Sequence, residues 1–345
     1  MADQLISLYE VELGRIKSFI KEVNAKKILL QAPNGLKPLL KYIINCLQKD
    51  LKTIDLYVSG SPSYGSCDLA VDEAKVIGAD AIIHLGHTMY PYMGYDIDIP
   101  VLYVPVYYKG TISDEIIKRL LSYVTREGIE SVIIIASIQY VKIAKMIYEK
   151  LGNYGVRVVK AKREKEFMED FQILGCYYSV LDEEDYDAII VVSSGLFHGI
   201  GACLYKPFAK TLLVDPVREE IMDLSNECKR ILAKRFYLIS SLVNKGYKSV
   251  VITTGTRPGQ YRYSLVKTLE ETFTKDDCSV YKVVVNYIDK NVLISLDNAF
   301  KPDFFIITNC PRLPIDDLGD FYKPVLTPGE ALMVANKSMK YRFPW

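Results

Sequence analysis

Short apolar runs that alternate with helical segments along the whole chain constrain its fold more than any other feature. The clearest runs are KKILLQA (26–32), SVIIIAS (131–137), DAIIVVSSG (187–195) and SVVITTGT (249–256). Most are rich in β-branched residues and lead through a polar or glycine-containing turn into a helical pattern. Strands that alternate with helices in this way form parallel sheets with helices on both faces. The sequence therefore predicts an α/β fold.

The strands fall into three cycles, whose first strands begin near residues 26, 131 and 249. A chain of 345 residues exceeds what one hydrophobic core usually serves. The weak repeat predicts three similar doubly wound parallel-sheet domains in a pseudo-threefold arrangement, with one cysteine contributed by each. Their expected bounds are 1–109, 110–216 and 217–345. We also expect a helix over residues 4–24 and a long helix from about 218 to 246.

Charge and composition restrict the classes of partner. Lys and Arg number 43 against 42 Asp and Glu, so no bulk charge attracts nucleic acid or an anionic membrane. The N-terminal segment does not have the pattern of a secretory signal, and no apolar run reaches the roughly eighteen residues of a membrane span. We therefore expect a cytoplasmic protein that binds neither nucleic acids nor membranes.

Three cysteines, one in each cycle, are the strongest functional signal. They are Cys67 in SYGSCDLA, Cys176 in QILGCYYS and Cys310 in ITNCPRLP, and each comes after a predicted strand. Ligands gather at the carboxyl ends of strands in open α/β sheets, so these thiols point to one crevice. They are too far apart in sequence for a local CxxC or CxxxCxxC site. The pattern predicts a metal site built from three parts of the chain; burial as small hydrophobes is the alternative.

The chain has seven cysteines in all. In a reducing compartment, thiols are expected rather than disulfides. Cys46, Cys203 and Cys228 are therefore predicted to be ordinary buried thiols.

Seven ordered segments, which together cover nearly the whole chain, carry a family resemblance. The chain resembles the archaeal-type diphthamide synthesis enzymes, the 2-(3-amino-3-carboxypropyl)histidine synthases. The segments are QAPNGLK, SGSPSYGSCDLAVDEA, GADAIIHLGH, QILGC, TRPGQYR, NCPRLPIDD and PVLTPGEA. In the first cysteine loop, Ser61 stands where an acidic residue is common in that family, which leaves open an altered paralogue.

The resemblance implies a homodimeric radical S-adenosylmethionine (SAM) enzyme of an unconventional kind. Cys67, Cys176 and Cys310 would together hold one 4Fe-4S cluster, and three thiolates leave one iron open to SAM. Such enzymes break the bond from sulfur to the methionine Cγ and release methylthioadenosine. They attach the 3-amino-3-carboxypropyl group to a histidine of translation elongation factor 2, the first step of diphthamide biosynthesis. The sequence does not identify the electron donor.

A turn between a strand and a helix, TTGTRPGQYR, is the candidate SAM contact. It resembles the KPGQ segment of the family, with Arg257 in place of Lys, followed by Gly259 and Gln260. Backbone N–H groups at such a turn suit the methionine carboxylate, and Arg257 or Gln260 would assist. The alternative is an ordinary strand-to-helix turn.

The three histidines and two aspartates have weaker assignments. His84 and His87 end the strand AIIHLGH, and we keep His87 as a candidate for lining the cofactor pocket. His198, in a glycine-containing loop, is expected in the pocket wall because the loop lacks GxGxxG spacing. Asp316 and Asp317 are expected to cap a turn rather than to orient a ligand.

Two other classes of function remain open from the sequence. One is a noncatalytic iron–sulfur partner that delivers electrons to, or supports, a sister enzyme. The other is a zinc-binding structural α/β protein. A partner subunit would bind a cluster but release no methylthioadenosine, whereas a zinc protein would purify colourless.

Overall fold

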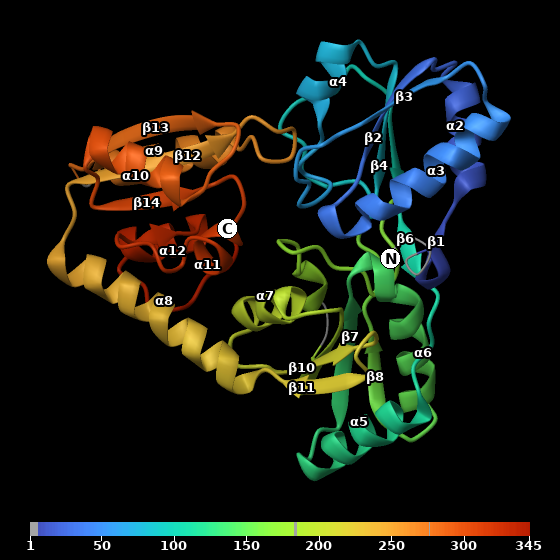
Figure 1. The fold of residues 1–345 in the computed structure, drawn as a ribbon. Coiled ribbons are helices and arrows are strands. Elements are labelled where there is room, and N and C mark those ends of the chain that lie inside the picture. Colours follow the sequence, from blue (N-terminus) through green and yellow to red (C-terminus); the bar gives the residue numbers. More distant parts are fainter. Residues whose placement is uncertain (1–5, 183–184, 276) are drawn as a thin grey trace.

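The computed structural model describes residues 6–182, 185–275 and 277–345, and it consists of three α/β lobes (Figure 1). Each lobe contains one mainly parallel sheet flanked by helices. The predicted fold class, three doubly wound sheets in a pseudo-threefold arrangement, is thereby confirmed. Among the described residues, no helix combines the length and apolarity that crossing a membrane requires.

The first sheet has the order β3-β2-β4-β5 and is parallel throughout. Its central strands are apolar and buried, as the run KKILLQA predicts, because helices cover both faces. The strands are β2 (Lys27–Gln31), β3 (Asp55–Val58), β4 (Ala81–Leu85) and β5 (Val101–Val104), and the helices are α2 (Leu13–Glu22), α3 (Lys37–Asp50) and α4 (Val71–Ile77).

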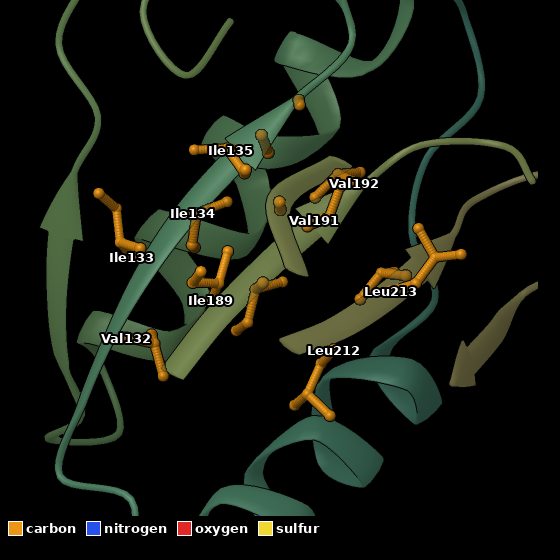
Figure 2. Close-up of a cluster of buried hydrophobic side chains, with 14 of the residues drawn as sticks. Val132, Ile133, Ile134, Ile135, Ile189, Val191, Val192, Leu212 and Leu213 are labelled. Atoms are coloured by element: carbon orange, nitrogen blue, oxygen red, sulfur yellow. The ribbon is translucent and has the colours of Figure 1, made fainter. Parts of the chain in front are cut away.

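The second sheet has the order β11-β10-β9-β7-β8, with only the edge strand β11 antiparallel. The Val, Ile and Leu side chains of its central strands form a buried apolar core (Figure 2). The strands are β7 (Ser131–Ala136), β8 (Arg157–Lys160), β9 (Ala188–Val192), β10 (Lys210–Asp215) and β11 (Glu220–Asp223), and the helices are α5 (Asp114–Arg126), α6 (Val141–Gly152) and α7 (Phe197–Tyr205). This sheet extends past residue 216, where we placed the second domain boundary; the three domain bounds stay a prediction.

The third sheet, in the order β13-β12-β14-β15, is again parallel. The long helix α8 (Ser225–Lys245) connects it to the second lobe (Figure 1). The strands are β12 (Ser249–Gly255), β13 (Ser279–Val285), β14 (Phe304–Ile307) and β15 (Val325–Leu326), and the helices are α9 (Tyr263–Lys275), α10 (Lys290–Phe300), α11 (Leu313–Asp316) and α12 (Pro328–Ala335).

Two helix predictions were wrong near their N-terminal ends. The helix expected over residues 4–24 is interrupted: residues 6–8 are helical, but β1 (Tyr9–Val11) pairs antiparallel with β6 (Val106–Tyr108), and α2 begins only at Leu13; residues 4 and 5 lie outside the described part. In the same way, β11 pairs with β10 ahead of α8. In both places a partner strand supplies backbone hydrogen bonds that local periodicity does not reveal.

The expectation of free thiols was wrong for one pair of cysteines. Cys203 of α7 and Cys228 of α8 form a disulfide, with their Cα atoms 5.8 Å apart. The two helices pack against each other, which brings together residues that are 25 positions apart in sequence. Cys46 is not part of a disulfide, and neither are the three cysteines singled out as metal ligands.

Candidate metal centre

The three predicted ligand cysteines lie on loops beyond the carboxyl ends of parallel strands. Cys67 follows β3, Cys176 follows β8 and Cys310 follows β14, so each sheet presents one thiol. All three cysteines are half-buried. The charges on Cys176 and Cys310 both help to raise the pKa of Cys67, so the three thiols lie within electrostatic reach of one another. The fold therefore brings three dispersed cysteines to one place.

The surroundings of the thiols oppose their ionisation in the absence of a positive partner. Burial is the main cause that raises the pKa of each thiol, well above the usual value for Cys67 and to about 12 for Cys310. Because a metal ligand must be a thiolate, a bound cation has to offset this cost. Such a set of thiols suits a metal centre.

The Cys67 loop is held by the turn between β12 and α9, which reaches from the third lobe to the first (Figure 1). Gly259 N donates to Cys67 O at 3.0 Å. A Cβ atom on Gly259 would lie only 2.5 Å from the Cα and Cβ atoms of Cys67, so no other residue fits without displacement. Arg257 forms ion pairs with Asp68 at 3.4 Å and Asp72 at 3.7 Å. The predicted SAM turn and the Cys67 loop thus form one unit.

Cys176 lies at the tip of a tight turn, in which Leu174 and Tyr177 exchange backbone hydrogen bonds of 3.3 and 3.1 Å. The preceding segment lies beside the end of β7 through a parallel bridge at Gln172. The Gln172 side chain donates to Thr88 Oγ1 at 2.7 Å, and the Tyr90 hydroxyl lies 3.4 Å from Cys176 Sγ. The second-lobe thiol is therefore positioned by the first lobe.

Cys310 is followed by backbone N–H groups that face its sulfur. Those of Arg312 and Leu313 lower its pKa, against the larger effect of burial. Arg312 donates to Asp316 from Nε at 2.8 Å and from Nη2 at 2.9 Å. The prediction that Asp316 caps a turn was therefore wrong: its carboxylate pairs with a buried guanidinium one helical turn away.

Arg262 is a site residue that our sequence analysis did not single out. Its guanidinium lies 4.4 Å from the ring centroid of Trp345 and also over the rings of Tyr90 and Tyr92. It donates to the Tyr90 hydroxyl, and its positive charge lowers the pKa of Cys176 against the effect of burial. Within the described residues, its buried Nε has no hydrogen-bond partner. Its position at the end of the TRPGQYR segment was the signal in the sequence that could have identified it as a site residue.

Gln260 lies between the SAM turn and the Cys310 strand. A Cβ atom on Gly255 would approach the Cβ of Gln260 to 2.7 Å and Asn309 Nδ2 to 2.9 Å, so the three residues pack closely. Asn309 directly precedes Cys310 and accepts from Thr253 Oγ1 at 3.0 Å. The side chain of Gln260 thus lies close to Asn309, the residue that precedes the third ligand.

The histidines lie where the first and second lobes meet. His84 is fully buried, and its Nε2 is 2.9 Å from Nδ1 of His87, which is half-buried. Burial lowers the pKa of His87 to about 4, so its ring is neutral. His198, at the start of α7, is half-buried with Nδ1 3.0 Å from Ser193 Oγ, and burial, Arg312 and His87 lower its pKa to about 3. His87 and His198 thus face the same region.

The electrostatic effects of the thiols on one another bear on what they could hold. Among residues 6–182, 185–275 and 277–345, no three His, Cys, Asp or Glu side chains gather closely enough for one metal ion. The three thiols influence one another's pKa and come from three sheets, so together they could hold one iron–sulfur cluster.

Comparisons with known proteins agree with this arrangement. The family model for diphthamide synthesis proteins matches residues 32–344. A 2-(3-amino-3-carboxypropyl)histidine synthase from Pyrococcus horikoshii is 28% identical over 97% of this chain and 93% of its own length. The protein of the same name from Methanocaldococcus jannaschii is 26% identical over 99% and 94%, respectively. The crystal structure of Dph2 from Pyrococcus horikoshii with a 4Fe-4S cluster matches with a TM-score of 0.83 and 27% identity, covering 98% of this chain and 94% of that one.

Proposed function

This chain belongs to the family of diphthamide synthesis proteins, and we propose that it transfers the 3-amino-3-carboxypropyl group of SAM to a histidine of translation elongation factor 2. Methylthioadenosine is the by-product. The observation that carries this proposal is that three thiols, one from each sheet, lie within electrostatic reach of one another. The fold that brings them together is similar to that of a Dph2 with a 4Fe-4S cluster. We further propose that the protein acts as a cytoplasmic homodimer.

Cys67, Cys176 and Cys310 would hold the cluster, one thiolate from each lobe. Bound there, a 4Fe-4S cluster supplies the electron for cleavage of the S–Cγ bond and an iron without a thiolate for SAM to approach. The chain supplies what stabilises negative charge on the sulfurs, namely the Tyr90 hydroxyl beside Cys176 and the backbone N–H groups after Cys310. The Arg262 guanidinium adds positive charge nearby.

We propose that Arg257, Gly259, Gln260 and His87 form the SAM side of the site. Because Arg257 is paired with two carboxylates of the first lobe, its part is to hold the turn against the Cys67 loop. Gly259 allows the close approach of the turn, and Gln260 offers an amide close to Asn309, which precedes the third ligand. The buried Nε of Arg262 is a donor suited to the methionine carboxylate.

The test is anaerobic incubation of the reconstituted, dithionite-reduced protein with SAM, followed by chromatography of the nucleosides. Methylthioadenosine is the expected product. 5′-Deoxyadenosine would show a conventional radical SAM reaction instead. Intact SAM beside a properly formed cluster would favour the noncatalytic partner, and a colourless protein with bound zinc would overturn both readings.

Gly259→Ala is expected to remove most of the bound iron. The added methyl group would overlap Cys67, and it would also lie 2.8 Å from Cδ1 of Tyr90. Overpacking of this kind costs about 1–3 kcal/mol, here concentrated on the loop that carries a ligand. Iron content and visible absorbance after anaerobic reconstitution measure the effect.

Gly60→Ala is the matched control, because Gly60 lies in the same loop and a Cβ atom there meets no atom of the described structure within 4 Å. This variant should keep its iron. Equal iron in the two variants would show that the close approach of Gly259 to Cys67 does not shape the metal site.

A further inference from the structure

The amide of Gln31, at the end of β2, is held in one orientation by two backbone groups. Its Nε2 donates to Asp68 O at 2.7 Å, and a carbonyl oxygen only accepts. Its Oε1 accepts from Ala70 N at 3.2 Å, and a backbone N–H only donates. The positions of oxygen and nitrogen in this buried side chain are therefore determined without reference to any histidine.

The fixed amide determines the tautomer of two histidines in turn. His84 Nδ1 lies 3.0 Å from Gln31 Oε1 and must carry a hydrogen, because that oxygen accepts. Burial lowers the pKa of His84 well below its usual value, so the ring is neutral and Nε2 only accepts. His87 Nδ1, 2.9 Å away, must then be the donor. In the neutral His87 ring this leaves Nε2 with its lone pair, able only to accept a proton or a hydrogen bond.

His87 is held close to the proposed cluster ligands. Its two near neighbours Thr88 and Tyr90 both contact the Cys176 turn, at 2.7 Å to Gln172 Nε2 and 3.4 Å to Cys176 Sγ. On the other side, Gln139 of the second lobe donates to Gly86 O at 2.7 Å. The half-buried imidazole is thus fixed at the junction of two lobes, close in the chain to the side chains that contact the Cys176 segment.

The proposed reaction needs a proton acceptor at that crevice. The name of the relatives places the new bond at carbon 2 of the target imidazole. In the net transfer, sulfur keeps the electron pair of the broken S–Cγ bond, and the alkyl group replaces the hydrogen on that carbon. The electron that starts the cleavage returns to the oxidised iron–sulfur cluster when the ring regains aromaticity. The transfer is therefore redox-neutral and releases one proton, which no ligand thiolate is free to take.

We propose that His87 Nε2 accepts the proton from carbon 2 of the target histidine, with Gln31 and His84 as positioning residues that fix its tautomer. This inference rests on the proposed function and names a catalytic residue within it. The three side chains form a chain of hydrogen bonds from the buried sheet to the crevice, and each link has a single direction.

His87→Asn separates the proton transfer from the cleavage step. The Asn amide nitrogen replaces Nδ1 as a donor to His84, but the acceptor at the Nε2 position is lost. Modification of elongation factor 2 should fall by about 10²-fold, the usual contribution of a general base, and the loss should exceed any loss of methylthioadenosine formation by at least about tenfold. Elongation factor deuterated at carbon 2 of the target ring should show an isotope effect in the variant that the parent lacks. Equal losses of cleavage and transfer, or unimpaired transfer, would overturn the proposal.

The tautomers of His84 and His87 can be measured in the absence of catalysis. The chain has only three histidines, so ¹⁵N-histidine NMR of the cluster-free protein resolves each ring. His84 and His87 should both carry hydrogen on Nδ1, and Gln31→Leu should release His84 and His87 into a mixture of tautomers while lowering transfer. A hydrogen on Nε2 of His87 in the parent would refute the inference. Absence of methylthioadenosine from the parent enzyme would instead count against the proposed function.

Discussion

Replacement of any one of Cys67, Cys176 or Cys310 by alanine is expected to abolish retention of the cluster and, with it, cleavage of SAM. The three thiols come from three lobes, so no neighbouring cysteine is available to take the place of a missing one. Their high pKa values mean that each is ionised only at the cost of burial, which metal binding offsets. Iron and sulfide content after anaerobic reconstitution, and the methylthioadenosine released on reduction, measure the loss.

Cys46→Ala is the control for this series. Cys46 is a free, half-buried cysteine on α3, and no described contact connects it with the three ligands. It should bind a full complement of iron and release methylthioadenosine at the parent rate. If all three single variants of the ligand set retained near-normal iron, the assignment of the ligands would be wrong, whatever the activity of the parent.

The central strands of the three sheets could be predicted because their pattern is local. β2, β7 and β12 are short, mainly apolar runs, and their burial on both faces follows from the helices between them. The motif around each cysteine was also local, since it depends on a turn directly after a strand. The family resemblance then supplied the link between the three cysteines that spacing alone left open.

What the sequence did not reveal depends on contacts between distant segments. β1 forms because β6, nearly a hundred residues later, offers it a partner, and the Cys203–Cys228 disulfide forms because α7 packs on α8. Arg262 stands among tyrosines of another lobe, which no periodicity predicts. Such contacts are set by how the lobes dock, so they require the folded structure.

Arg235→Met is expected to lower the free energy of unfolding by about 3–5 kcal/mol, the usual cost of leaving one member of a buried ion pair alone. Arg235 of α8 and Glu330 of α12 are 2% and 0% exposed, respectively. The guanidinium donates to Glu330, to Val325 O at 2.7 Å and to Pro314 O at 3.1 Å. The variant would leave the Glu330 carboxylate buried without its counter-charge. Denaturant unfolding followed by circular dichroism measures the change.

Two further variants distinguish the cost of leaving a buried carboxylate unpaired from the cost of merely removing an arginine side chain. Arg230→Met removes an exposed ion pair with Glu227 on the same helix and should leave the free energy of unfolding nearly unchanged. Combining Arg235→Met with Glu330→Leu should recover much of the stability, because apolar residues of similar volume often replace a buried pair without loss. If Arg235→Met cost no more stability than Arg230→Met, the Arg235–Glu330 ion pair would not be what joins α8 to α12.

Arg235→Met should also lose its iron at a lower temperature than the parent. Arg235 donates to Pro314 O, and Pro314 lies four residues after Cys310, so the stability of the third lobe is connected to the metal site.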